Sequence, residues 1–340
     1  MHFFTQRLLA TPALTRDWER VALKTNQVDP FCSSPTWQLA FHDGEGSQGY
    51  LLLEAVDNSL IAFALKHIAG GSLPRGVYLA PLESAWCFGC PVLGPNGVDL
   101  LVEALEFAQS VVKYPVHALV SGIRPQGKLL RLLRKTFETR NTKKQYRLVR
   151  HNGGCQASAS LVGGLAGFLS RRSANFRSKL KKSRRQATDA GIYFERIAPQ
   201  SPDVARQVYS RILLVERQSW KGLGHCGVNE PGAREFYACL IMRLAAHNRA
   251  RVIFARHEDK DIGYIFGGMA GRIYRGQQFS YADTWRRFSI GNLMQREKIC
   301  WLCEEGAVRY DMGPIDNEAM HYKHLWTERH CLYETWAICS

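Results

Sequence analysis

The apolar positions in the first half of the chain recur with two periods, which predict a mixture of strands and helices. Two β-rich runs flank the turn dipeptide Asp57-Asn58, a pattern typical of a β-hairpin. Further on, apolar residues recur every three or four positions, as on one face of a helix. We therefore expect strands at Gly49–Val56, Ser59–Ile68, Val77–Ala80 and Pro115–Ser121, and helices at Gly97–Val112 and Gly127–Phe137.

The pattern in the second half predicts a longer series of elements. A basic helix capped by Ser173 precedes a strand, two helices and three strands joined by tight turns. A loop, a helix and a last strand complete the series. The expected strands are Ile192–Ile197, Arg251–His257, Asp261–Ala270, Arg272–Tyr281 and Ala307–Asp311, and the other helices are Pro202–Ser219, Ala233–Asn248 and Asn292–Glu305.

A glycine-containing segment between the halves, Asn141–Gly167, predicts a loose domain junction. It carries Gly153-Gly154 and Gly163-Gly164 with small polar residues between them. A chain of 340 residues also suits two medium domains better than one. We therefore expect an α/β protein with mixed α+β sheets, divided into residues 1–150 and 151–340. A duplication would explain why both halves contain a hairpin followed by a helix and a strand.

The stretch from Phe279 to Gly313 predicts an anion site. A strand leads through the loop Arg286–Gly291 into a helix. The first N–H groups of a helix have no partner within it, and the helix dipole adds partial positive charge there. Arg286 and Arg287 add full charges, and Gly291 lets the backbone approach a ligand closely. These features favour the pyrophosphate of a coenzyme A-type molecule.

The positive net charge of the chain limits the kinds of partner that we expect it to bind. The formal net charge of +15 points to nucleic acid, a phosphorylated cofactor, an acidic carrier protein or an acidic peptide. A surface of solvated lysines and arginines explains the charge equally well. The N-terminus lacks the pattern of a signal peptide, and no run approaches the roughly 20 apolar residues of a membrane span. We therefore expect a cytoplasmic protein.

The ten cysteines are expected to be mostly reduced, without a metal. Two Cys-x-x-Cys pairs, Cys87/Cys90 and Cys300/Cys303, have the spacing of zinc half-sites but lie far apart in sequence. The second pair falls within an expected helix, where small apolar side chains pack in the core. The cluster His321–His324 could also supply metal ligands, but we expect no metal there either.

The loop has the form Arg286-x-x-Ser289-x-Gly291 and lies between an antiparallel meander and a helix that leads to another strand. This arrangement resembles the GNAT acyltransferase fold, whose loop is Arg/Gln-x-x-Gly-x-Gly/Ala; Ser289 replaces the middle glycine. Most of the chain is similar to one branch, the CelD/BcsL-type proteins related to the FemAB group. The segments that carry this resemblance are Asp29–Phe31, Ser34–Trp37, Phe176–Arg185, Glu216–Lys221, Tyr281–Gly291, Arg309–Gly313 and Tyr322-Lys323.

The resemblance implies two GNAT-like domains in tandem, the acyl-CoA N-acyltransferase fold. The C-terminal one carries the cofactor loop, and Cys90–Gly97 holds the comparable place in the first domain without an arginine. It also implies an N-acyltransferase that uses acyl-CoA, or acyl carrier protein, and an amine of a peptide, an amino sugar or a small metabolite. The strand that ends at Tyr281 would pair with the pantetheine arm. The implied cofactor-binding residues are Arg286, Arg287, Phe288, Ser289, Ile290, Gly291 and Asn292.

An alkyl amine, with a pKa near 10.4, must lose a proton before it attacks a thioester. Glu216, at the end of a helix, is the first candidate for the base, and Asp283 and Asp311 follow. Each of them could instead form an ion pair or cap a helix. Tyr281 or Tyr310 could protonate the leaving thiolate, although a core role is also open to both.

Three further residues are candidate contacts with the acyl group, the acceptor or the carrier. They are Trp220, Tyr322 and Lys323. Packing in the core would equally explain Trp220, and a solvated segment would explain the other two.

Three functions stay open from the sequence: the N-acyltransferase, a FemAB-like transferase that uses aminoacyl-tRNA, and a non-catalytic protein on a decayed fold. Eight of the fifteen residues from Arg171 to Arg185 are Lys or Arg. This helix could bind phosphates of RNA or of a carrier, or it could be solvated. A tRNA donor has no coenzyme pyrophosphate for the loop to hold, which favours the acyltransferase.

Overall fold

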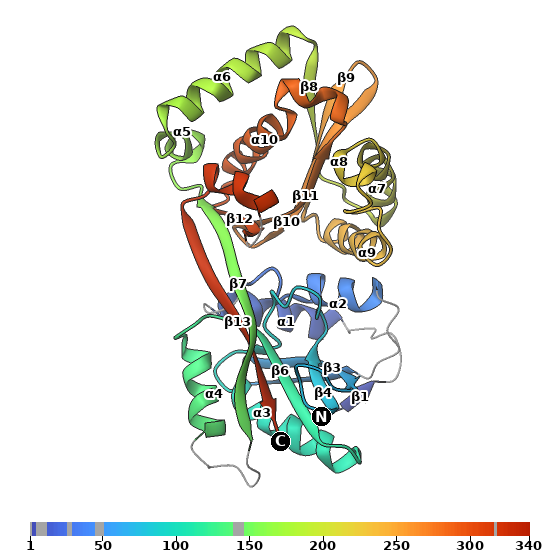
Figure 1. Cartoon of the computed structure of the whole chain (residues 1–340), viewed down its shortest axis with the longest axis vertical. Coiled ribbons are helices and arrows are strands. Elements are labelled where there is room, and N and C mark those ends of the chain that lie inside the picture. The colour runs from blue at the N-terminus through green and yellow to red at the C-terminus, as the bar shows by residue number, and fades with distance from the viewer. Residues whose placement is uncertain (1, 5–11, 26–28, 45–50, 139–145, 316–317) are drawn as a thin grey trace. The chain divides into compact units, whose positions relative to one another are not determined.

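The computed structural model describes residues 2–4, 12–25, 29–44, 51–138, 146–315 and 318–340 (Figure 1). Its contacts divide the chain into two units. The first is Met1–Gly154 together with Leu332–Ser340, and the second is Cys155–Cys331. The sequence had suggested 151–340 as one domain. The C-terminal segment joins the first unit instead, because strand β13 (Arg329–Cys339) pairs with β6 (Val116–Ile123).

The first unit is a mixed sheet covered by helices. Its strands follow the order β1-β2-β3-β4-β6-β13, and a short strand, β5, pairs with β3. Helix α3 buries its apolar face in this unit's core, as its spacing predicted. The strands not yet given are β1 (His2–Phe4), β2 (Leu51–Val56), β3 (Ser59–Ile68), β4 (Gly76–Pro81) and β5 (Val92–Leu93), and the helices are α1 (Pro12–Lys24), α2 (Pro35–Gly44), α3 (Gly97–Val111) and α4 (Lys128–Glu138).

The second unit has the same layered construction. Its sheet follows the order β7-β12-β11-β10-β9-β8. Helices α5, α6 and α10 cover one face, and α7, α8 and α9 lie on the other (Figure 1). The strands are β7 (Arg147–Ser160), β8 (Ile192–Ile197), β9 (Ala250–His257), β10 (Lys260–Ala270), β11 (Ile273–Tyr281) and β12 (Arg309–Pro314). The helices are α5 (Gly164–Ser170), α6 (Ala174–Asp189), α7 (Pro202–Arg217), α8 (Trp220–Leu223), α9 (Ala233–Ala245) and α10 (Ile290–Glu304), with the 3₁₀ helices η1 (Asp283–Phe288) and η2 (Glu318–Leu325).

Strands β11 and β12 part early. They run parallel for three register pairs, the last of which joins Arg275 to Asp311. In the described part of the chain, no strand pairs with this edge of β11 beyond Arg275. The other edge of β11 pairs with β10 along its whole length, with an irregularity at Phe266/Gly267. One edge of β11 therefore offers backbone N–H and C=O groups that no strand uses.

The first unit repeats this motif. There β3 and β4 are antiparallel, α3 follows, and β6 runs parallel to β4 for three register pairs that begin at Val77↔Val116. The series β10, β11, α10 and β12 has the same directions and the same short parallel contact. The prediction of a mixed α/β chain with one fold in tandem is confirmed.

The boundary between the units, at Gly154/Cys155, falls within Asn141–Gly167, but this segment is not loose over most of its length. Residues 141–145 lie outside the described part of the chain, and β7 and α5 occupy most of the remainder. Gly163 and Gly164 have positive φ, 84° and 67°, at the start of α5, whereas Gly153 serves close packing of backbones. A Cβ at Gly153 would lie 2.6 Å from the carbonyl oxygen of Tyr333 in β13. Glycine is therefore used here for close approach of two strands.

We expect Gly267→Ala to destabilise the second unit. Its Cβ would lie 2.2 Å from the carbonyl oxygen of Arg275, at the irregularity that sets the β10–β11 register. The expected loss is about 2–4 kcal/mol, which lowers the melting temperature by roughly 5–10 °C. Gly276→Ala is the comparison variant: a Cβ at this register partner would lie 2.8 Å from the ring of Tyr310, and we expect a smaller loss because a side chain can shift where a backbone carbonyl cannot. Equal melting temperatures for the two variants would contradict the backbone constraint.

Candidate functional site

The loop after β11 presents a helix N-terminus beside two arginines. Ser289 adopts the left-handed conformation, with φ 55° and ψ 38°. The N–H of Leu293 donates to the carbonyl of Ser289 as the first bond of α10, so the N–H groups of residues 290–292 precede the helical bonding. Arg286 and Arg287 are exposed, and neither has an ion-pair partner among the residues that the structure describes. These groups fit a pyrophosphate.

Aromatic rings pack against the start of α10. A Cβ at Gly291 would lie 3.1 Å from the ring of Phe279 and 3.2 Å from that of Tyr281. Glycine thus lets the end of β11 contact the first turn of the helix. The side chain of Asn292 is already engaged, since its Oδ1 accepts a hydrogen bond of 3.3 Å from Nε1 of Trp326. Of the predicted cofactor residues, Ile290 is buried, which leaves its backbone as the group for a ligand.

Helix η2 brings Tyr322 against the same strand. Its ring lies 5.4 Å from that of Phe279, in an edge-to-face arrangement. Lys323 is buried and donates to the carbonyl oxygen of Pro314. The structure therefore places Tyr281, Tyr322 and the loop on the same side of β11, as a common site requires. It places Lys323 beside the end of β12.

Buried charges gather where β11 and β12 part. Arg275 donates to Oε1 of Gln156 at 2.8 Å, and Arg309 donates to Oδ2 of Asp311 at 2.8 Å. A Cβ at Gly313 would lie 3.5 Å from Nη2 of Arg275 and 3.8 Å from Nζ of Lys323. Asp311, the third candidate base, is thus already in an ion pair.

Tyr310 faces the opposite way, toward α10. Its hydroxyl donates to Oε1 of Gln295 at 2.8 Å, and burial raises its pKa far above the usual tyrosine value. The hydroxyl therefore holds its proton and has a fixed acceptor. These contacts fit the core role that the sequence left open.

Glu216 lies on the α7 face of the sheet. It is fully buried, and its carboxylate accepts hydrogen bonds from the N–H of Val228 at 3.3 Å, from Ser219 at 3.2 Å and from Tyr264 at 3.0 Å. Burial and this carboxylate raise the pKa of Tyr264. Glu216 thus fastens the segment between α7 and α9 to β10. Its role as base stays a prediction.

Lys221 is a residue that the sequence analysis did not single out as functional. Its Nζ donates to Oε1 of Gln278 at 2.8 Å and to the carbonyl of Phe279 at 3.0 Å. Burial lowers its pKa, against the opposing effect of Glu216. Gln278 in turn donates to the hydroxyl of Tyr237 at 2.8 Å. No sequence signal marked this lysine, because its partners Gln278 and Phe279 lie more than fifty residues away.

Asp283 is exposed at the start of η1. Its N–H donates to the carbonyl of Gln218 at 3.1 Å, and Ala282 forms a β-bridge with Ser219. The end of β11 is therefore attached to the turn that follows Glu216. The three carboxylates do not form one cluster: Asp283 is at the surface, Glu216 is beneath the sheet, and Asp311 is in β12.

Comparison with known families bears on the second unit. Residues 174–324 match the family model described as an acetyltransferase (GNAT) domain. This part of the chain is similar to GNAT domains. The family supports an acyltransferase, as the sequence predicted. No curated protein sequence matches the chain.

Solved structures extend the likeness to the whole chain. FemX has a TM-score of 0.67 at 10% identity and covers 98% of this chain and 97% of its own. The C-terminal domain of a proposed lysylphosphatidylglycerol synthetase from Agrobacterium fabrum scores 0.54 at 12% identity and covers 95% and 91%. L-PGS from Bacillus licheniformis scores 0.55 at 14% identity and covers 93% of each chain. At these identities the likeness shows the fold alone, two GNAT-like units in tandem.

The described residues contain no group of three or more His, Cys, Asp or Glu placed to hold a metal ion. None of the ten cysteines forms a disulfide in the described structure, and Cys300 and Cys303 lie on α10 as expected. None of the helices in the described ranges is long and apolar enough to cross a membrane.

We expect Glu216→Gln to lower turnover by roughly 10²-fold or more if this carboxylate is the base, with donor affinity unchanged. The variant also directs an NH₂ donor at groups that already donate, which costs about 1–3 kcal/mol of stability. Tyr264→Phe is the control, since it removes one of these hydrogen bonds and keeps the carboxylate. Turnover and melting temperature are measured for both. Full turnover in folded Glu216→Gln would move the base to Asp283 or Asp311.

Proposed function

We propose that the protein is an N-acyltransferase that moves an acyl group from a phosphopantetheine thioester to an amine. The donor is acyl-CoA or acyl carrier protein, and the acceptor is a peptide, an amino sugar or a small metabolite. The observation that carries this proposal is the open edge of β11 leading into the loop Arg286–Gly291 and the N-terminus of α10.

The donor fits this arrangement group by group. A pantetheine arm contains amides, which can pair with the free backbone edge of β11 as an added strand does. The N–H groups at the start of α10, with Arg286 and Arg287, are suited to the pyrophosphate. Ser289 keeps a left-handed turn without the family's glycine, so the loop retains its shape. This supports a functional donor site over a decayed one.

The transfer itself needs few groups. The acceptor nitrogen attacks the thioester carbonyl carbon, a C–N bond forms, the C–S bond breaks, and the amine proton leaves through a base. The displaced thiolate then takes up a proton. Glu216, Asp283 and Asp311 are our candidates for the base, and Tyr281 is our candidate for the acid. Tyr281 contacts the start of α10, which would place it beside the donor.

A second candidate function is transfer from aminoacyl-tRNA, favoured by the surface of α6. Arg177, Lys179, Lys181, Lys182 and Arg184 are exposed on this helix. In the described ranges, the one ion pair of an α6 side chain joins Arg185 to Asp189. Because α6 contacts η1, these charges lie near the donor loop. A large acidic donor, carrier protein or tRNA, would gain from them.

We expect Arg286→Ala with Arg287→Ala to weaken binding of acyl-CoA by roughly 10- to 100-fold, because two charged hydrogen-bond donors to the pyrophosphate are lost. Titration calorimetry measures the dissociation constant. Arg206→Ala with Lys260→Ala removes two exposed charges elsewhere in the same unit and serves as the control. Unchanged affinity in the loop variant would refute the pyrophosphate assignment.

Charge reversal on α6 distinguishes between the candidate donors. We expect Lys181→Glu with Arg184→Glu to lower kcat/KM at least 10-fold with an acyl carrier protein, or with aminoacyl-tRNA, whichever is the donor. The value for acyl-CoA should change less than threefold, since we expect the loop and the start of α10, rather than α6, to bind its pyrophosphate. Arg206→Glu with Lys260→Glu is the matched control. Equal losses with all donors would show that α6 acts on the loop rather than on a macromolecule.

A further inference from the structure

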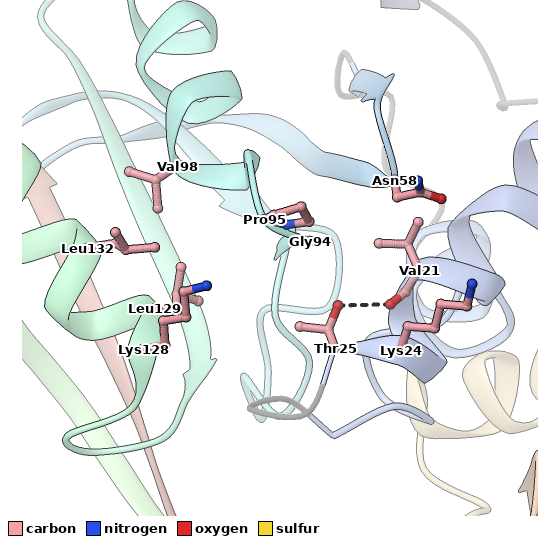
Figure 2. A pocket seen from close by; sticks show the side chains of 10 residues that line it. All are labelled: Val21, Lys24, Thr25, Asn58, Gly94, Pro95, Val98, Lys128, Leu129 and Leu132. Carbon is pink, nitrogen blue, oxygen red and sulfur yellow. Dashed lines mark hydrogen bonds between the residues drawn. The ribbon is translucent and has the colours of Figure 1, made fainter.

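The first unit contains a pocket of about 390 Å³ that the proposed reaction does not use. A volume of this size falls within the range of small-molecule sites, roughly 300–1,000 Å³. Figure 2 shows Val21 and Lys24 of α1, with Thr25 just after it, on one side and Lys128, Leu129 and Leu132 of α4 on the other, with Gly94 and Pro95 between them. All the residues that line this open pocket therefore belong to one unit.

The lining combines positive charge with aliphatic surface. Lys24 and Lys128 are exposed lysines on opposite sides of the pocket, and none of the ten lining residues is acidic. Neither lysine has an ion-pair partner among the residues that the structure describes. Val21, Val98, Leu129 and Leu132 add apolar side chains. Such a lining suits an anion that carries an aliphatic part.

The pocket also lies at the start of α3, the crossover helix of the first unit. Strands β4 and β6 are parallel, so the segments that follow them lead from the same edge of the sheet into α3 and α4. Val98 lies in the first turn of α3, and Lys128 and Leu129 begin α4. The start of α3 corresponds to the start of α10, where the second unit has its donor loop. The loop Cys90–Gly97 has no arginine, but Lys24 of α1 and Lys128 of α4 line the same pocket as Gly94 and Pro95 of this loop.

We propose that this pocket binds a phosphate monoester with an aliphatic substituent. Both lysine side chains are long and exposed, so an ammonium group can reach a phosphate in the pocket, and the aliphatic walls match the substituent. The site is separate from the donor loop, and the proposal does not depend on the acyltransferase reaction. It gives the first unit a ligand of its own in place of a purely supporting role.

The test uses the full chain with Arg286→Ala and Arg287→Ala, so that the donor loop contributes little. The probe is 4′-phosphopantetheine, and pantetheine and inorganic phosphate are the comparison ligands in titration calorimetry. We expect the phosphorylated probe to bind at least 10-fold more tightly than either comparison ligand. Adding Lys24→Ala and Lys128→Ala should weaken its binding at least 10-fold.

Two further variants keep the result interpretable. Lys113→Ala removes an exposed charge just past the opposite end of α3, and the probe should bind it normally. Leu132→Trp fills the pocket while keeping both lysines, and it should abolish binding. The proposal fails if wild-type loop residues are required for all binding, if pantetheine binds as well as the phosphorylated probe, or if neither the lysine nor the tryptophan variant reduces affinity.

Discussion

The early parting of two parallel strands is the constraint on which each unit depends. Strands β11 and β12 share three register pairs, and β4 and β6 share three in the first unit. A parallel pair needs a crossover helix, and that helix begins beside the edge where the strands separate. The separation leaves backbone groups of one strand free and brings the positive end of a helix to the same place. A ligand with amides and a phosphate can satisfy both, which is why this motif suits thioesters of phosphopantetheine.

In the second unit, polar and charged side chains surround the end of β11. On one side of β11, Phe279 and Tyr281 pack on Gly291. On the other, Lys221 donates to the carbonyl of Phe279, and Glu216 accepts three hydrogen bonds from its own loop and from β10. Burying such groups is costly unless each is paired, so their pairing fixes the loop between α7 and α9 against the sheet. A single strand is thereby held by a helix start on one face and by a polar network on the other.

The sequence predicted the parts whose signal is local. Periodicity and caps placed α3, α6 and the β9–β10–β11 meander within a few residues, and Ser173 caps α6 as expected. The errors arose where distant segments decide the structure. Strand β7 has glycines because a neighbouring strand approaches closely, and β13 belongs to the first unit because β6 pairs with it. Neither partner can be read from the segment itself.

The same contrast between local and long-range signals explains which site residues the sequence did and did not predict. The loop Arg286–Gly291 was predictable because a strand, an arginine pair and a helix start follow one another in the chain. The position of Lys221 could not be predicted, because its hydrogen bonds go to Gln278 and Phe279, more than fifty residues away. The pocket of the first unit is a stronger case, because its lysines come from α1 and α4, far apart in the sequence, and line one pocket only in the folded unit. The absence of an arginine from Cys90–Gly97 therefore does not prevent the first unit from binding an anion. Positive charge at a helix start can come from any element that the fold brings there.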